Sequence, residues 1–116
     1  MSDIQIYHNP RCSKSRQTLA LLEENGIQPT IIEYLKVPPD EKELHTVLKQ
    51  LNMNARDLLR KGEAIYKELG LSDTSLSEQQ LITAMCENPK LIERPIVIHN
   101  GKAKIGRPPE AVLDIL

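Results

Sequence analysis

The first third of the chain places apolar residues in two short runs on either side of an amphipathic segment. Residues 4–7 alternate in a way that predicts a strand. Residues 13–25 carry apolar side chains at helical spacing, and Gly26 supplies the stop, so a helix is predicted there. Residues 30–35 are rich in β-branched and aromatic side chains and predict a second strand. Since such crossovers are right-handed, we expect the two strands to be parallel.

Helical periodicity dominates roughly residues 40 to 90. Asp40 with Glu43, and later Ser77 with Gln80, have the spacing of capping boxes, in which two side chains satisfy the free backbone N–H groups at a helix start. Each pair precedes a run with one apolar face. Shorter helical pieces are predicted between these two helices.

The last part of the chain predicts a β-hairpin followed by a helix. Residues 96–99 and 102–105 are strand-like, and Asn100-Gly101 between them is the strongest short hairpin signal that a sequence offers. A final helix is expected from Glu110.

The predicted order of elements is β-α-β, a helical block, and β-β-α. This order indicates an α/β protein with a mixed sheet of about four strands. It is the order of a thioredoxin-like fold that carries a helical insertion, at about residues 40–90, between its N-terminal βαβ and C-terminal ββα units. With 116 residues, we expect a single domain, residues 1–116, that buries one core without disulfides or metals.

Composition and charge argue against several classes of partner. A chain that is 40% apolar with a net charge of −1 has no general attraction to nucleic acid or to membranes. Neither a signal-peptide pattern nor a run of about 18 apolar residues occurs, so a cytoplasmic protein is expected. Its two cysteines, Cys12 and Cys86, lie far apart without metal-ligand spacing, so neither a disulfide scaffold nor a metal site is predicted.

The candidate chemistry lies in the stretch from His8 to Arg16, which reads HNPRCSKSR. Cys12 stands where the first predicted helix begins, with Arg11 and Lys14 also close in sequence. The free N–H groups and positive dipole end of a helix favour a thiolate, so we predict that the pKa of Cys12 is well below that of an ordinary thiol. The alternative is a small buried side chain, because free cysteine is among the most buried residue types. The basic residues near Cys12 in sequence favour its interpretation as a nucleophile over a buried structural residue.

Ser15 occupies the position at which a thioredoxin-type CxxC motif has its second cysteine. Two roles stay open for Ser15, a hydroxyl donor to the thiolate or a plain first-turn helix residue. Because Ser15 stands in place of that second cysteine, the thiol that resolves a Cys12 intermediate is expected to come from another molecule. Cys86 lies beside Met85 on an apolar helix and is expected to be structural, with internal resolution of Cys12 as the alternative.

Five motifs extend over nearly the whole chain and resemble, in order and spacing, those of the glutaredoxin-coupled arsenate reductase (ArsC-like) family. They are HNPRCSKSR at 8–16, the LLRK run that ends at Arg60-Lys61, ELG at 68–70, ERPIVI at 93–98 and IGRPPE at 105–110. The chain is most similar to a shorter subgroup, because it ends at Leu116 and has Ser13-Lys14 where the best-known members have Gly-Thr.

The resemblance implies a role for six residues. Cys12 is the nucleophile, His8 assists ionisation of the thiol, and Arg94-Pro95 is a cis peptide bond facing the cysteine. Three arginines bind the oxyanion and the arsenic-bearing intermediates: Arg60, Arg94 and Arg107. From the sequence alone, the alternative for each arginine is a solvated, salt-bridging side chain, and for Arg60 this alternative is the stronger one.

The function implied is the reduction of arsenate to arsenite. The Cys12 thiolate attacks As(V), glutathione is the co-substrate, glutaredoxin resolves the mixed disulfide, and no cofactor is bound. A second hypothesis is an Spx-like redox regulator that binds RNA polymerase. Such sensors rely on a CxxC switch, which CSKS at 12–15 lacks, so the enzyme is favoured. A third is a general glutaredoxin-like thiol oxidoreductase for which arsenate is incidental.

Overall fold

The computed structural model describes residues 4–116. The chain forms two compact units, of which one combines the chain up to Val37 with Arg94–Leu116 and the other is Pro38–Glu93. The second unit coincides with the region in which the helical insertion is predicted. Within the described residues, no helix is both long enough and apolar enough to cross a bilayer.

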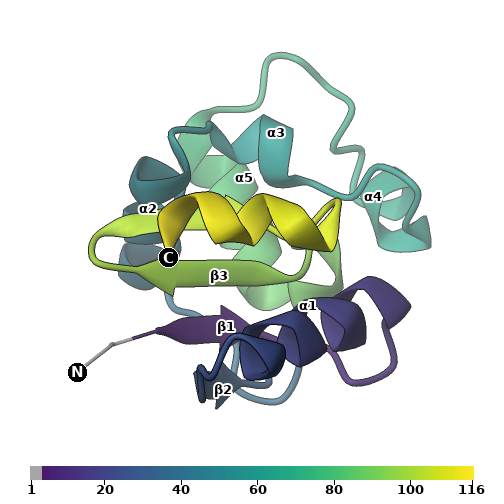
Figure 1. Ribbon diagram of the computed structural model, residues 1–116. Helices are drawn as coiled ribbons and strands as arrows, with labels where there is room; N and C mark the ends of the chain where they lie inside the picture. Colours follow the sequence, from purple (N-terminus) through teal and green to yellow (C-terminus); the bar gives the residue numbers. More distant parts are fainter. Residues whose placement is uncertain (1–3) are drawn as a thin grey trace. The chain divides into compact units, whose positions relative to one another are not determined.

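The first unit contains a mixed four-stranded sheet, as predicted (Figure 1). Its strands are β1 (Gln5–Tyr7), β2 (Thr30–Ile32), β3 (Ile96–His99) and β4 (Lys102–Ile105). They lie in the order β2-β1-β3-β4, with β1 parallel to β2, and with β3 antiparallel to both β1 and β4. The thioredoxin-like order of elements and the Asn100-Gly101 hairpin are thereby confirmed.

Strand β2 is shorter than predicted. It ends at Ile32, because residues 33–37 form a turn in which the N–H groups of Lys36 and Val37 donate to the Glu33 carbonyl. Tyr34 is 1% exposed and its ring stacks on Tyr7 at a centroid distance of 6.3 Å. The aromatic residue that favoured a longer strand thus contributes to the core from a turn.

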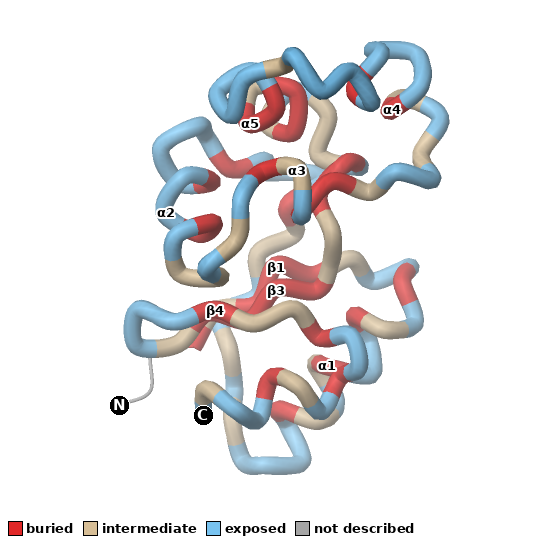
Figure 2. The backbone as a smooth tube through the Cα atoms, turned by 90° about the horizontal axis from the view of Figure 1, so that it is seen from above, coloured by how far each residue is buried: buried red, intermediate tan, exposed pale blue. Residues whose placement is uncertain are grey.

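Helix α1 (Ser13–Glu24) and the C-terminal 3₁₀ helix η2 (Pro109–Ile115) pack on one face of the sheet (Figure 1). The core on this face consists of five buried side chains: Ile4, Ile6, Leu22, Val97 and Val112. Ile6 and Val97 are register partners in β1 and β3, so their side chains point the same way. Figure 2 shows β1 and β3 as largely buried. The last helix starts one residue before the predicted Glu110 and is 3₁₀ rather than α.

The second unit is helical, with α2 (Glu41–Leu51), α3 (Ala55–Leu58), α4 (Ala64–Glu68), α5 (Glu78–Glu87) and the 3₁₀ helix η1 (Pro89–Leu91). Both predicted capping boxes are confirmed. The Asp40 carboxylate accepts the Glu43 N–H at 2.7 Å, and the Ser77 hydroxyl accepts the Gln80 N–H at 3.1 Å. These caps start α2 and α5 where the sequence predicts them, and each helix buries its apolar face.

Candidate active site

Cys12 is the N-cap residue of α1 and is 8% exposed. Its own N–H donates to the Asn9 carbonyl at 3.0 Å, and its carbonyl accepts the first helical bond from Arg16. The Asn9 side chain accepts the Arg11 N–H at 3.0 Å and so closes the turn before the helix. This turn holds the thiol against the free N–H groups of the first helical turn.

Backbone donors and two arginines determine the ionisation of the thiol. Burial opposes ionisation, but hydrogen bonds from the N–H groups of Ser15 and Lys14 and the charges of Arg94 and Arg107 outweigh it. The pKa of Cys12 therefore lies below its ordinary value, in the predicted direction. The charges come from the far end of the chain, and not from the basic residues next to Cys12 in sequence.

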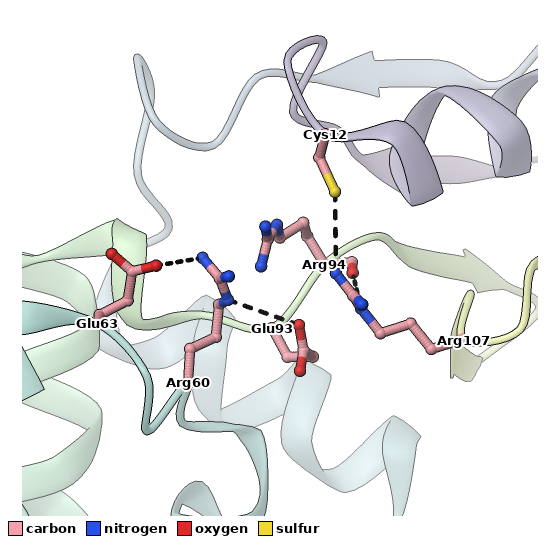
Figure 3. Close-up of polar contacts among 6 residues, drawn as sticks. All are labelled: Cys12, Arg60, Glu63, Glu93, Arg94 and Arg107. Atoms are coloured by element: carbon pink, nitrogen blue, oxygen red, sulfur yellow. Dashed lines mark hydrogen bonds and ion pairs between the residues drawn. The ribbon is translucent and has the colours of Figure 1, made fainter.

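Arg107 makes the direct contact with the sulfur. Its Nη2 lies 3.8 Å from Cys12 Sγ, while its Nε donates to the Arg94 carbonyl at 2.9 Å (Figure 3). The second bond holds the guanidinium in place, so its charge stays directed at the thiol. Two of the three predicted arginines are thus brought to the sulfur within the first unit.

The peptide bond between Arg94 and Pro95 is cis, where the resemblance places a cis bond, and the bond between Arg107 and Pro108 is cis as well. The two segments are tied together, because the Gly106 N–H donates to the Pro95 carbonyl at 2.9 Å. Both arginines therefore leave the backbone from one connected pair of loops.

His8 and Ser15 form a buried pair beside the cysteine. His8 Nδ1 lies 2.6 Å from Ser15 Oγ, which also accepts the Asn9 N–H at 3.0 Å. The pKa of His8 is lowered, chiefly by burial, with Glu33 acting in the opposite direction. In the neutral tautomer with the proton on Nε2, His8 Nδ1 accepts a hydrogen bond from the Ser15 hydroxyl. The Ser15 hydroxyl is therefore engaged with His8, and the thiol is supported by the Ser15 backbone N–H.

Arg60 belongs to the second unit, where it is held by two carboxylates. Its Nη1 lies 2.6 Å from Glu63 Oε2 and its Nε 3.8 Å from Glu93 Oε1 (Figure 3). Its backbone N–H donates to the Leu91 carbonyl at 2.8 Å, next to the bridge between Leu59 and Ile92. This is the salt-bridged arrangement that the sequence analysis gives as the alternative for Arg60.

Comparison with known proteins shows to which family the chain belongs. The sequence matches the model of the ArsC family over residues 7–115. The chain belongs to the ArsC family. It is similar to YfgD of Escherichia coli K12, with 61% identity over 114 residues that cover 97% of this chain and 96% of YfgD.

This ArsC-family chain is also similar to the arsenate reductase of Haemophilus influenzae, with 53% identity over 112 residues, covering 96% of this chain and 97% of that protein. Among solved structures, the arsenate reductase from Vibrio cholerae superimposes with a TM-score of 0.97 at 55% identity, covering 99% of this chain and 98% of that one.

The second cysteine of this ArsC-family chain lies in a different environment. Burial and four carboxylates raise the pKa of Cys86 to about 11; the carboxylates belong to Glu41, Asp40, Glu43 and Glu87. Cys86 therefore remains a thiol at neutral pH, which favours the structural role over internal resolution of Cys12. Within residues 4–116, no group of three or more His, Cys, Asp or Glu side chains is placed to hold a metal ion.

Gly106 is a site residue that the sequence analysis missed. A side chain at this buried position would begin 2.8 Å from Pro95 Cγ and would collide with Thr18 Oγ1. The glycine therefore lets the loop that carries Arg107 lie against α1 and Pro95. The GRP tripeptide at 106–108 is the signal, because a glycine directly before a functional arginine indicates a close backbone approach.

Proposed function

We propose that this protein reduces arsenate to arsenite, with Cys12 as the nucleophile, glutathione as co-substrate and glutaredoxin as the protein that regenerates the thiol. One observation carries the proposal. The Arg107 guanidinium lies 3.8 Å from Cys12 Sγ at a helix N-terminus, so a nucleophilic sulfur and donors for an oxyanion occupy the same place. The names of the relatives from Haemophilus influenzae and Vibrio cholerae support the choice of arsenate.

The electrostatics suit an anionic substrate. A thiolate and arsenate repel each other unless cations neutralise the site. Arg94 and Arg107 supply fixed positive charge, and guanidinium forks match the edges of a tetrahedral oxyanion. Arg60 is the third arginine in the proposal. Because Glu63 and Glu93 hold its guanidinium, an anion would have to compete with those carboxylates for it.

The reaction balances with two thiols as the reductant. The Cys12 thiolate forms a bond to arsenic, and one arsenate oxygen takes up protons and leaves as water. A glutathione thiolate then attacks the Cys12 sulfur. As the S–S bond forms, the S–As bond breaks and its electron pair stays on arsenic, which changes from As(V) to As(III). Arsenite leaves, and glutaredoxin takes the glutathione from the mixed disulfide and restores the Cys12 thiolate.

The Spx-like regulator is less well supported. A CxxC switch needs a second thiol in the position of Ser15, and that residue is a buried serine bonded to His8. Cys86 does not replace it, because burial and its carboxylate neighbours raise its pKa and hold it in the unreactive thiol form.

The test is a coupled assay of the purified protein with arsenate, glutathione, glutaredoxin, glutathione reductase and NADPH. Arsenate-dependent NADPH consumption is expected from the wild type and from Cys86→Ser, and none from Cys12→Ser, since serine is too weakly acidic to replace the thiolate. Arsenate-independent reduction of a small disulfide, without any response to arsenate, would favour the general thiol oxidoreductase instead.

A further inference from the structure

A groove of about 400 Å³ runs between α1 and the start of η2. On one side it is lined by residues that share a face of α1: Lys14, Gln17, Leu21 and Glu24. On the other side lie Pro108, Pro109 and Glu110. All of these residues belong to the unit that contains Cys12.

One wall of the groove begins at a residue that acts on the thiol, and the other begins directly after one. Lys14, at one end of the α1 wall, donates its backbone N–H to Cys12. Pro108, at the start of the other wall, directly follows Arg107, whose guanidinium contacts the sulfur. Cys12 and Arg107 themselves do not line the groove, so this end adjoins the thiol site through Lys14 and Pro108.

We propose that this groove is the binding site for glutathione, the co-substrate on which the proposed function rests. The thiol of the tripeptide lies at the Lys14 end, where the Lys14 ammonium binds the glycine carboxylate. The γ-glutamyl arm extends along the groove. Its ammonium faces the carboxylates of Glu24 and Glu110, and the Gln17 amide donates to its carboxylate.

The dimensions and charges of the groove fit this occupant. From Lys14 to Glu24 the helix rises about 15 Å, and an extended tripeptide spans about 10–11 Å. The volume is within the range of roughly 300–1,000 Å³ typical of small-molecule sites. One cation near the thiol and two carboxylates further along complement a ligand whose carboxylate and ammonium groups lie on opposite sides of its sulfur.

The experiment measures thiol–disulfide exchange at Cys12, which requires no arsenate. The thiolate attacks one sulfur of glutathione disulfide, the S–S bond of the disulfide breaks, and one glutathione thiolate leaves. The rate is compared with that for 2-hydroxyethyl disulfide, which has no charges for the groove to recognise. The comparison is made for the wild type and for Glu24→Lys and Glu110→Lys, singly and together.

Glu23→Lys is the matched control. Glu23 neighbours Glu24 in the last turn of α1 and is exposed but does not line the groove, and a lysine suits the helix C-terminus at either position. Glu23→Lys and Glu24→Lys alter the net charge of the protein equally, so each increases the general attraction of the anionic glutathione disulfide. We expect Glu23→Lys to react as fast as the wild type or faster, and the double groove variant to react roughly tenfold more slowly with glutathione disulfide alone.

Equal rates for Glu24→Lys and Glu23→Lys would overturn the site. An equal loss with 2-hydroxyethyl disulfide would also overturn it, because the groove would then affect the thiol and not the ligand. A rise in the KM for glutaredoxin with unchanged glutathione exchange would assign the groove to a protein partner instead. A wild type that shows the selectivity for glutathione disulfide but no arsenate turnover would remove the proposed function and leave the groove assignment intact.

Discussion

The substitution Gly106→Ala tests how the loops position the thiol site. The new methyl group would lie 2.8 Å from Pro95 Cγ, 3.1 Å from Thr18 Cγ2, and in collision with Thr18 Oγ1. Neither neighbour moves away easily. The Thr18 hydroxyl donates to the Lys14 carbonyl at 2.8 Å, and the Pro95 carbonyl accepts the Gly106 N–H at 2.9 Å.

Two effects are expected from this crowding. Overpacking of a buried position costs about 1–3 kcal/mol, which in a chain of this size lowers the melting temperature by roughly 4 °C per kcal/mol. The loop also moves away from α1 and takes Arg107 with it. Since a displacement of about 1 Å near the reacting atoms can cost roughly 100-fold, we expect at least a tenfold fall in arsenate-dependent turnover. Displacement of the Arg107 charge from the sulfur should raise the pKa of Cys12.

The assays are thermal unfolding, the coupled NADPH assay, and the pH dependence of alkylation by iodoacetamide. Gly62→Ala is the control, because Gly62 has no atom within 4 Å of the new methyl group and no left-handed backbone conformation. Thr18→Ala combined with Gly106→Ala removes part of the collision, so the double variant should lose less stability than the sum of the single variants. A Gly106→Ala protein as stable and as active as Gly62→Ala would refute the reasoning.

Three further predictions concern the thiols and their neighbours. The alkylation rate of Cys12 should reach its midpoint at a lower pH than that of an ordinary thiol, because its lowered pKa keeps the thiolate populated at that pH. Cys86 should react only near pH 11. Equal midpoints for the two cysteines would contradict both assignments. Arg107→Ala should lower arsenate turnover roughly 10- to 100-fold, with Arg107→Lys recovering only part, since a point charge lacks the fork geometry. His8→Ala should raise the Cys12 midpoint less than Arg107→Ala does, because His8 is neutral and bonds to Ser15; NMR titration of His8 should give a pKa below the ordinary histidine value.

Local signals in the sequence predicted much of the fold. The capping boxes at Asp40 and Ser77 depend on side chains three residues apart, and Asn100-Gly101 determines its own turn, so each could be inferred without knowledge of the rest of the chain. The position of Cys12 at the start of α1 followed from the same kind of reasoning.

Features that depend on tertiary contacts were harder to predict. Tyr34 has a strand-like sequence context, yet it lies in the turn after β2, where its ring stacks on Tyr7. The low pKa of Cys12 was predicted from the helix N-terminus and from Arg11 and other basic neighbours in sequence. The N–H groups of the helix start do lower this pKa, but the cations that act on it lie more than 80 residues away. Charge close in sequence is no measure of charge close in space, because exposed side chains at a turn point into solvent.

The tripeptide Gly106-Arg107-Pro108 shows how a cation that is distant in sequence is brought to Cys12. The glycine allows the backbone to approach α1, and the residue before a proline is restricted to extended conformations, so the Arg107 side chain leaves the loop in a narrow range of directions. The bond from Arg107 Nε to the Arg94 carbonyl then fixes the remaining freedom. A change at Gly106 or Pro108 is therefore expected to move the Arg107 guanidinium relative to the sulfur. For this reason the pH profile of Cys12, more than the melting temperature, reports whether the loop is in place.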